Sequence, residues 1–291
     1  MSHTALDDYL ARLPRAPVPD HRIWLDAVHQ ARGRYFNCTL TSVFQPLRVL
    51  DSGQVLAHEA FVRSAADGKP GLSVWRLLEG AASDEESIEL DRLCRMLHAV
   101  NFFRQPGADA ADLYLGVHER LLAAVSNNHG MVFRRVLESL GLPLRRIVLQ
   151  LPQARSSHRF LLQYVADNYQ RSGFRVALNV ADAAEGLRML QLMRPDAIKV
   201  DARALADTAP VQELAQACAA QGICLVFKRV DRQAVSDALL GLRSLAMPLL
   251  VQGRLWDQPQ SLLHAQEPPC AGAPVVCDQT ATRHVPIPGT R

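Results

Sequence analysis

Residues 174–201, FRVALNVADAAEGLRMLQLMRPDAIKVD, decide the fold class. Two short and almost continuously apolar runs, 174–180 and 196–201, flank a segment in which Leu187 and Leu190 recur at helical spacing. Strands that are apolar on both faces and are separated by helices are typical of a buried parallel sheet. The stretch therefore predicts a strand–helix–strand unit of an α/β protein.

The same alternation extends in both directions along the chain. Further apolar runs that fit short strands are 43–50, 55–63, 112–118, 146–152, 223–230 and 248–254. The turn Asp51-Ser52-Gly53 joins the first two of these as an antiparallel hairpin, and helical patterns separate most of the others. Eight strands over about 210 residues fit a closed TIM-like (β/α) barrel with one antiparallel strand better than an open sheet.

The two ends of the chain differ from this pattern. We expect residues 1–37 to form a helical extension, with one helix before Pro14 and a second amphipathic helix that begins near Ile23. The barrel domain is predicted over 38–263. Residues 264–291 are rich in Pro, Ala, Gly and Thr and lack hydrophobic periodicity, so we expect a disordered tail, with docking on a partner as the alternative.

Composition argues against several classes of protein. Lys and Arg number 32 against 29 Asp and Glu, a formal net charge of +3, which indicates neither a dedicated nucleic-acid binder nor a membrane binder. No apolar run reaches the roughly 18 residues of a transmembrane helix, and the N-terminus lacks the apolar core of a signal peptide. The six cysteines show no metal-site spacing, and those in the barrel are expected to be buried reduced thiols. We expect a cytoplasmic protein.

Several short segments in a fixed order carry a resemblance to a known family. They are Phe44-Gln45-Pro46, Glu59 with Arg63 four residues later, the segment LRMLQLMRPDAIKVD that ends at Asp201, and Gln252-Gly253. In this order and spacing, the chain from about residue 40 to 263 resembles the EAL domain family of cyclic-di-GMP phosphodiesterases. The resemblance implies a barrel whose site lies at the carboxyl ends of the strands, where two divalent cations held by acidic oxygens activate water.

The resemblance, carried over one residue at a time, implies two sets of positions. The candidates for ligand binding are Gln45, Glu59, Phe61, Arg63, Lys199, Asp201, Lys228, Asp231 and Gln252. Family metal ligands are replaced at Gly116, Gln150, Asn179, Val180 and Lys228. Among the acidic metal ligands, Glu59 is the one that clearly remains, and Lys228 places an ammonium where the family has a glutamate.

One carboxylate beside an ammonium holds a divalent cation weakly, so we predict that the two-metal site and its hydrolysis are lost and that no cofactor is bound. A buried Glu59 is costly unless a cation pairs with it. We therefore predict that a lysine, Lys228 or Lys199, lies within salt-bridge distance of Glu59. The alternatives are that Glu59 pairs with Arg63 and that Lys199 pairs with Asp201, because each pair shares one face of its strand.

The sequence leaves functions of different classes open. The first is a catalytically inactive signalling module that binds cyclic di-GMP without metal, a protein partner, or both. The second is an enzyme, a weak Mg- or Mn-dependent cyclic-di-GMP phosphodiesterase. A homodimer is expected from the resemblance alone, and the sequence does not identify a partner.

Overall fold

The structure is a computed structural model of the chain. It describes residues 3–19, 21–66, 69–70, 83–119, 122, 129–153, 159–205, 209–241 and 248–263. The tail predicted over 264–291 lies outside the described residues.

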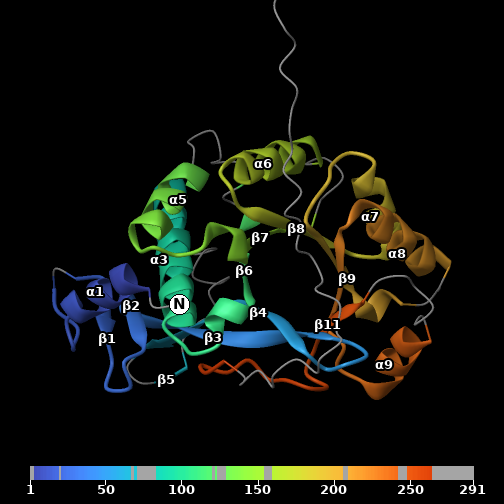
Figure 1. Cartoon of the computed structure of the whole chain (residues 1–291). Helices are drawn as coiled ribbons and strands as arrows, with labels where there is room; N and C mark the ends of the chain where they lie inside the picture. The colour runs from blue at the N-terminus through green and yellow to red at the C-terminus, as the bar shows by residue number, and fades with distance from the viewer. Residues whose placement is uncertain are drawn as a thin grey trace, which may run out of the picture.

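The described strands form one eleven-stranded sheet, most of which curves into a closed barrel (Figure 1). In sheet order the strands are β1 (Ile23–Leu25), β2 (Ala31–Tyr35), β3 (Cys38–Val49), β11 (Leu250–Gln252), β10 (Cys224–Lys228), β9 (Ala197–Asp201), β8 (Arg175–Val180), β7 (Ile147–Leu151), β6 (Asp112–Gly116), β4 (Val55–Ala66) and β5 (Lys69–Pro70). An additional pairing of β3 with β4 closes the ring. The barrel therefore consists of β3, β4 and β6 to β11.

The barrel is mixed because β3 runs antiparallel to both of its neighbours. Its ladder with β4 contains a bulge at Leu47/Arg48, and on its other side Val49 pairs with Leu250 of β11. The other neighbouring barrel strands pair in parallel. Each of the predicted apolar runs coincides with one barrel strand, which confirms the TIM-like barrel with one antiparallel strand.

The helices lie outside the barrel strands (Figure 1). They are α3 (Asp84–Phe103), α5 (His129–Ser139), α6 (Arg159–Arg171), α7 (Ala183–Leu190), α8 (Ala209–Gln221) and α9 (Gln233–Leu240), with 3₁₀ turns at Ala108–Ala110, Leu144–Arg146 and Ala202–Ala204. Helix α7 begins at Ala183 because the Asp182 side chain accepts a hydrogen bond from the backbone N–H of Glu185 at 2.7 Å. The Glu185 carboxylate accepts in turn from the backbone N–H of Ala181 at 2.6 Å. The two side chains thus satisfy two backbone N–H groups at the start of the helix.

The alternating side chains of the strands build two separate apolar cores. The barrel interior contains Leu47, Val49, Ala57, Tyr114, Val148, Ala177, Ala197, Cys224, Val226 and Leu250. The opposite faces of the same strands pack against the helices, and they contribute residues such as Leu113, Leu149 and Ile198. The four cysteines in the described part of the chain, Cys38, Cys94, Cys218 and Cys224, are free and buried, as predicted.

A buried ion pair fixes α3 against its neighbouring helices. The Arg95 guanidinium lies 2.7 Å from the carboxylate of Asp91, one turn earlier, and both side chains are almost fully buried. The guanidinium carbon also lies 5.7 Å from the ring centroid of Phe133 in α5 and 5.9 Å from that of Tyr169 in α6. One cation therefore links three helices through its charge and its flat face.

The predicted helical extension is correct in its first half and wrong in its second. Helix α1 (Thr4–Arg12) forms before Pro14, but the predicted second helix is replaced by β1 and β2. Asp26 provides a physical reason, because its carboxylate accepts hydrogen bonds from the backbone N–H groups of Val28 at 3.0 Å and Gln30 at 2.8 Å. These bonds close a turn in which His29 adopts a left-handed φ of 59°, so a helix cannot continue through it.

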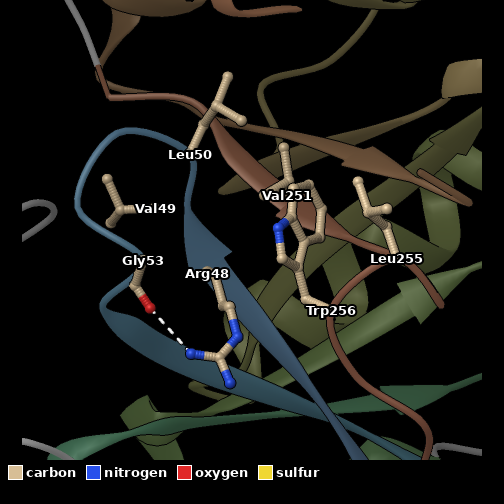
Figure 2. Close-up of a pocket in the computed structure, with 7 residues that line it drawn as sticks. All are labelled: Arg48, Val49, Leu50, Gly53, Val251, Leu255 and Trp256. Atoms are coloured by element: carbon tan, nitrogen blue, oxygen red, sulfur yellow. Dashed lines mark hydrogen bonds between the residues drawn. The ribbon is translucent and has the colours of Figure 1, made fainter. Parts of the chain in front are cut away.

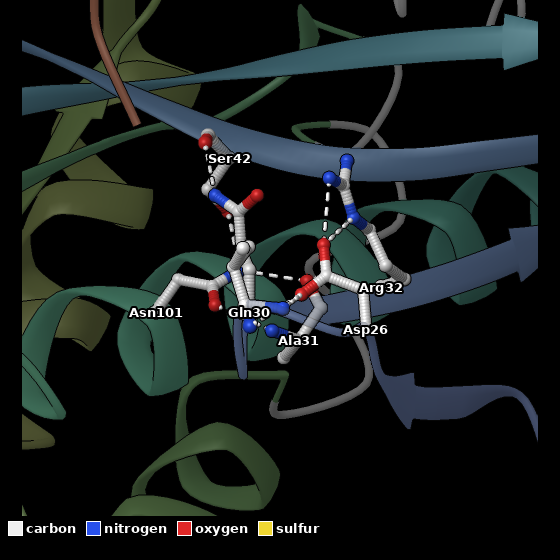
Figure 3. A network of polar contacts seen from close by, with 7 residues as sticks. Asp26, Gln30, Ala31, Arg32, Ser42 and Asn101 are labelled. Carbon is white, nitrogen blue, oxygen red and sulfur yellow. Dashed lines mark hydrogen bonds and ion pairs between the residues drawn. The ribbon is translucent and has the colours of Figure 1, made fainter. Parts of the chain in front are cut away.

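Buried polar contacts then dock β2 on the barrel (Figure 3). The side chain of Asn101, in α3, donates to the backbone carbonyl of Ala31 and accepts from its N–H, both at 2.8 Å. The Gln30 amide donates to the backbone carbonyl of Ser42 at 3.2 Å. The segment therefore continues the barrel sheet, and the domain limits of 38–263 stay a prediction. In the described part of the chain, no helix has the length and apolar character needed to cross a membrane.

Candidate ligand site at the barrel mouth

A ring of polar side chains lies beyond the apolar interior, at the carboxyl ends of the strands. Because side chains alternate along a strand, the residue two positions after an inward apolar residue faces inward too. The inward pairs are Ala57 and Glu59, Val148 and Gln150, Ala177 and Asn179, Ala197 and Lys199, Val226 and Lys228, and Leu250 and Gln252. The sheet thus gathers six of the predicted positions at the mouth, where barrel enzymes carry their sites.

Lys199 lies at the centre of this ring and is fully buried. Its ammonium donates to Glu59 Oε2 at 2.7 Å, to Gln150 Oε1 at 2.6 Å and to Gln252 Oε1 at 3.1 Å. It also lies 5.3 Å from the ring centroid of Tyr114. Each ammonium proton therefore has an acceptor, and the buried positive charge is compensated.

Glu59 is held as a carboxylate by these neighbours. Its Oε1 accepts from the Gln150 amide at 3.0 Å, and its side chain is 18% exposed. Burial alone raises the pKa of Glu59, but the Lys199 ammonium and the hydrogen bonds outweigh it, so the pKa lies below its ordinary value. The predicted pairing of Glu59 with a lysine is confirmed, and Lys199 is the partner.

Both alternative pairings are wrong. Arg63 is exposed, and its guanidinium donates to the backbone carbonyl of the adjacent Val62 at 3.3 Å. Asp201 accepts from Arg203 at 2.8 Å and from Arg229 at 2.7 Å. Burial by itself raises the pKa of Asp201, but the hydrogen bonds from the two arginines lower it well below its usual range. Asp201 is therefore part of an ion-pair cluster at the rim.

Lys228 is a second lysine in the ring, and its surroundings differ. It is half-buried, and its ammonium donates to Asn179 Oδ1 at 2.6 Å. The Asn179 amide is fixed in turn by donating to the backbone carbonyl of Leu151 at 2.8 Å. Burial and, next, the nearby Lys199 ammonium lower the pKa of Lys228 to about 8.

The remaining candidates are less central. Gln45 is the cross-strand partner of Glu59, but its amide donates to the backbone carbonyl of Asp257 at 2.9 Å. Asp231 accepts from the backbone N–H of Arg254 at 2.8 Å, which directs it to the loop after β11. Phe61 is half-buried in β4. The structure thus joins Glu59, Lys199 and Gln252 in one hydrogen-bonded group and places Lys228, bonded to Asn179, on the strand next to Gln252. Phe61, Arg63 and Asp231 lie outside this group.

The positions at which the sequence predicted lost metal ligands do not offer the oxygen ligands that a pair of divalent cations needs. Gly116 has no side chain and faces open space, and Val180 is buried in the core beneath the helices. The carboxylate oxygens of Glu59 already accept from Lys199 and Gln150. No group of three His, Cys, Asp or Glu side chains within the described ranges is placed to hold a metal ion. Such cations need several oxygen ligands, which this set does not supply.

Sequence reasoning missed two contributors to the site. Gln150 was predicted only as a lost metal ligand, yet its amide both donates to Glu59 and accepts from Lys199. Tyr114, whose ring faces the Lys199 ammonium, was not singled out. The inward register of β6 and β7 is the signal that identifies both, because Tyr114 and Val148 face the barrel interior.

A separate cavity of about 400 Å³ lies beside the β3–β4 turn, and none of the predicted site residues lines it (Figure 2). Trp256, Leu255 and Val251 form part of its wall. Arg48 borders it and is fixed by both carboxylate oxygens of Asp257, at 2.6 and 2.7 Å. This cavity is distinct from the polar ring.

Comparison with known proteins places this geometry in a family. The EAL domain family matches residues 28–259. No curated protein sequence matches the chain significantly.

Solved structures with a similar fold include three that contain c-di-GMP. The Bacillus subtilis YkuI protein, with an EAL domain, c-di-GMP and calcium, has a TM-score of 0.64 at 18% identity, covering 78% of this chain and 57% of that one. Klebsiella pneumoniae BlrP1 with FMN and c-di-GMP but no metal ions has a TM-score of 0.56 at 19% identity, with 86% and 56% covered. A standalone EAL protein from Vibrio cholerae O395, in its c-di-GMP bound form, has a TM-score of 0.57 at 16% identity, with 78% and 95% covered. The chain spans little more than half the length of the first two, and at these identities the likeness establishes the fold.

Proposed function

Because the chain belongs to the EAL domain family, we propose that it is a non-catalytic signalling module whose barrel mouth binds cyclic di-GMP without divalent metal. Three structurally similar proteins are described as c-di-GMP complexes, and one of these complexes has no metal ions. The proposal combines this family ligand with the particular side chains at the mouth of this barrel.

The observation that carries the proposal is the hydrogen bond of 2.7 Å between the Lys199 ammonium and Glu59. The acidic ligand that remains is bound to a cation of the protein itself, so it is not available to hold a metal. Lys228 adds a second ammonium, which donates a hydrogen bond to the neutral amide of Asn179. The mouth therefore carries a positive charge that favours the phosphodiester anions of a cyclic dinucleotide.

Titration calorimetry with cyclic di-GMP in EDTA tests the binding. We expect binding by the wild type and an affinity at least about tenfold lower for Lys228→Met, because one charge-assisted hydrogen bond contributes about 1.5–3 kcal/mol. Arg134→Gln, a surface change on α5, is the matched control and should bind as the wild type does. Absence of heat at high micromolar ligand would contradict nucleotide binding and leave a role with a protein partner.

Incubation with cyclic di-GMP and Mn²⁺ or Mg²⁺ tests the absence of catalysis. We expect no linear product above the rate of a Glu59→Ala control. Product above that rate would favour the second candidate, a weak metal-dependent phosphodiesterase. The reverse experiment introduces acids at three positions, Gln150→Glu, Asn179→Asp and Lys228→Glu. This triple variant should gain metal binding.

We also propose that a protein surface contributes to the function, and that its occupant is a second copy of the chain. Val132 and Val136 on α5 are 42% and 36% exposed, and Phe160 and Tyr164 on α6 are 80% and 54% exposed. Each pair is spaced by one helical turn, so its two side chains lie on the same face of their helix. We take these two apolar stripes as the candidate interaction surface. A two-fold dimer buries the same stripe on both subunits.

Sedimentation velocity over a range of concentrations tests the dimer. We expect a concentration-dependent dimer that Phe160→Ser with Tyr164→Ser abolishes. Val28→Ser, an exposed valine near β2, is the control and should leave the dimer intact. A monomer at every concentration would contradict self-association.

A further inference from the structure

We infer that Lys228 is a site of reversible carbamylation, at which its amine adds carbon dioxide to form a carbamate. The inference concerns a covalent modification at the mouth, and it holds whether or not cyclic di-GMP binds there. It follows from the contrast between the two lysines of the polar ring.

Lys199 and Lys228 differ in access and in hydrogen bonding. Lys199 is fully buried, and its three protons are directed to oxygen acceptors. Lys228 is half-buried, and its amine donates a hydrogen bond to Asn179 Oδ1 at 2.6 Å. Its amine is therefore the one that a small solute in the mouth can reach.

The surroundings of Lys228 favour the loss of its proton. Burial is the main cause and the neighbouring Lys199 ammonium the second, and together they bring the pKa of Lys228 to about 8. At pH 8 about half of this amine is therefore neutral and nucleophilic. Arg229 acts in the same direction, whereas Glu59 and Asp201 oppose it.

Both opposing carboxylates are already paired with other cations. Glu59 accepts from Lys199 at 2.7 Å, and Asp201 accepts from Arg203 and Arg229 at 2.8 and 2.7 Å. Lys228 therefore faces an excess of positive charge. A reaction that replaces its positive charge by a negative one turns repulsion into attraction.

Carbon dioxide is the co-reactant that gives such a product. The amine lone pair forms a bond to the carbon, one carbon–oxygen π pair moves to oxygen, and the nitrogen proton leaves to water. No oxidant or reductant takes part. An aldehyde would instead give an imine, which is neutral or positive, so the charge around Lys228 favours the carbamate over the imine.

The test is carbon-13 NMR of the whole chain with labelled bicarbonate at pH 8, compared between the wild type and Lys228→Arg. Arginine keeps the positive charge and removes the nucleophilic amine. We expect one carbamate signal that Lys228→Arg abolishes, whereas a signal from the N-terminal amine persists in both proteins. At a fixed concentration of dissolved carbon dioxide, the Lys228 signal should increase as the pH rises through about 8.

Trapping on the wild type alone keeps the test independent of how the variant folds. An alkyl oxonium reagent converts carbamates to stable esters, and mass spectrometry of peptides should locate the adduct on Lys228. An identical set of signals in Lys228→Arg, or the absence of an adduct on this residue, would overturn the inference.

Discussion

Replacing Lys199 by methionine tests the central feature of the mouth, the buried ammonium with its three acceptors. Methionine retains the apolar stem but removes the charge, so Glu59 loses its cationic partner while its side chain stays mostly buried, at 18% exposure. Removal of one partner of a buried ion pair costs about 3–5 kcal/mol, and Gln150 and Gln252 also lose their donor. Because these contributions overlap, we expect a total loss of about 3–5 kcal/mol, a large share of the stability of a domain.

The loss should depend on pH in a direction fixed by Glu59. In the wild type the pKa of Glu59 lies below 4.5, so the carboxylate contributes stability above about pH 4.5 that disappears as the pH falls. In Lys199→Met, burial is no longer opposed by the ammonium and raises this pKa above 4.5. Protonation of Glu59 then removes the uncompensated charge from the variant as the pH falls. The difference in unfolding free energy between the two proteins should therefore be smaller at pH 4 than at pH 7.

Urea unfolding at several pH values measures these differences. Exchange of both partners, Lys199→Met with Glu59→Leu, should recover most of the loss, because an apolar pair removes the uncompensated charge. The reasoning is refuted if Lys199→Met costs less than about 1 kcal/mol, or if its cost is the same at pH 7 and pH 4.

Three further substitutions test other parts of the fold by the same unfolding measurement. Arg95→Met should lower the free energy of unfolding by about 3–5 kcal/mol, because it leaves its carboxylate partner on α3 buried without a cation. Arg134→Met, in a half-exposed pair on α5, should lower it by less than about 1 kcal/mol. Equal losses in the two variants would contradict this reasoning. Burial lowers the pKa of His98 to about 3, so the wild type loses stability as the pH falls below 6.5. His98→Gln should therefore reduce the slope of unfolding free energy against pH by up to about 1.4 kcal/mol per pH unit in this range. An unchanged slope would refute this prediction. Gly253→Ala should cost at least about 2 kcal/mol, because a Cβ there would lie 2.0 Å from a backbone oxygen, and Gly116→Ala, in open space, should cost much less.

Helix and strand could be predicted wherever one local pattern dominated. The apolar runs and helical spacing of 174–201 predicted β8, α7 and β9 correctly, since both periods are visible in the residue order. The segment after Ile23 was assigned the wrong element. Its apolar spacing suits a helix, but the turn closed by Asp26 and the docking of Ala31 on Asn101 favour strands. Such contacts join residues far apart in the sequence and leave no local pattern.

The order of residues was enough to predict the barrel and the alternation of inward and outward side chains along each strand. It did not show which lysine binds Glu59, because that depends on how neighbouring strands are aligned. In the ladder between β9 and β10, Lys199 is level with Val226, whereas Lys228 is level with Asp201. The register of neighbouring strands therefore places Lys199 deeper, among Glu59 and the buried amides, and Lys228 nearer the rim. That register is set by hydrogen bonds between strands, so neither lysine's own segment of sequence contains it.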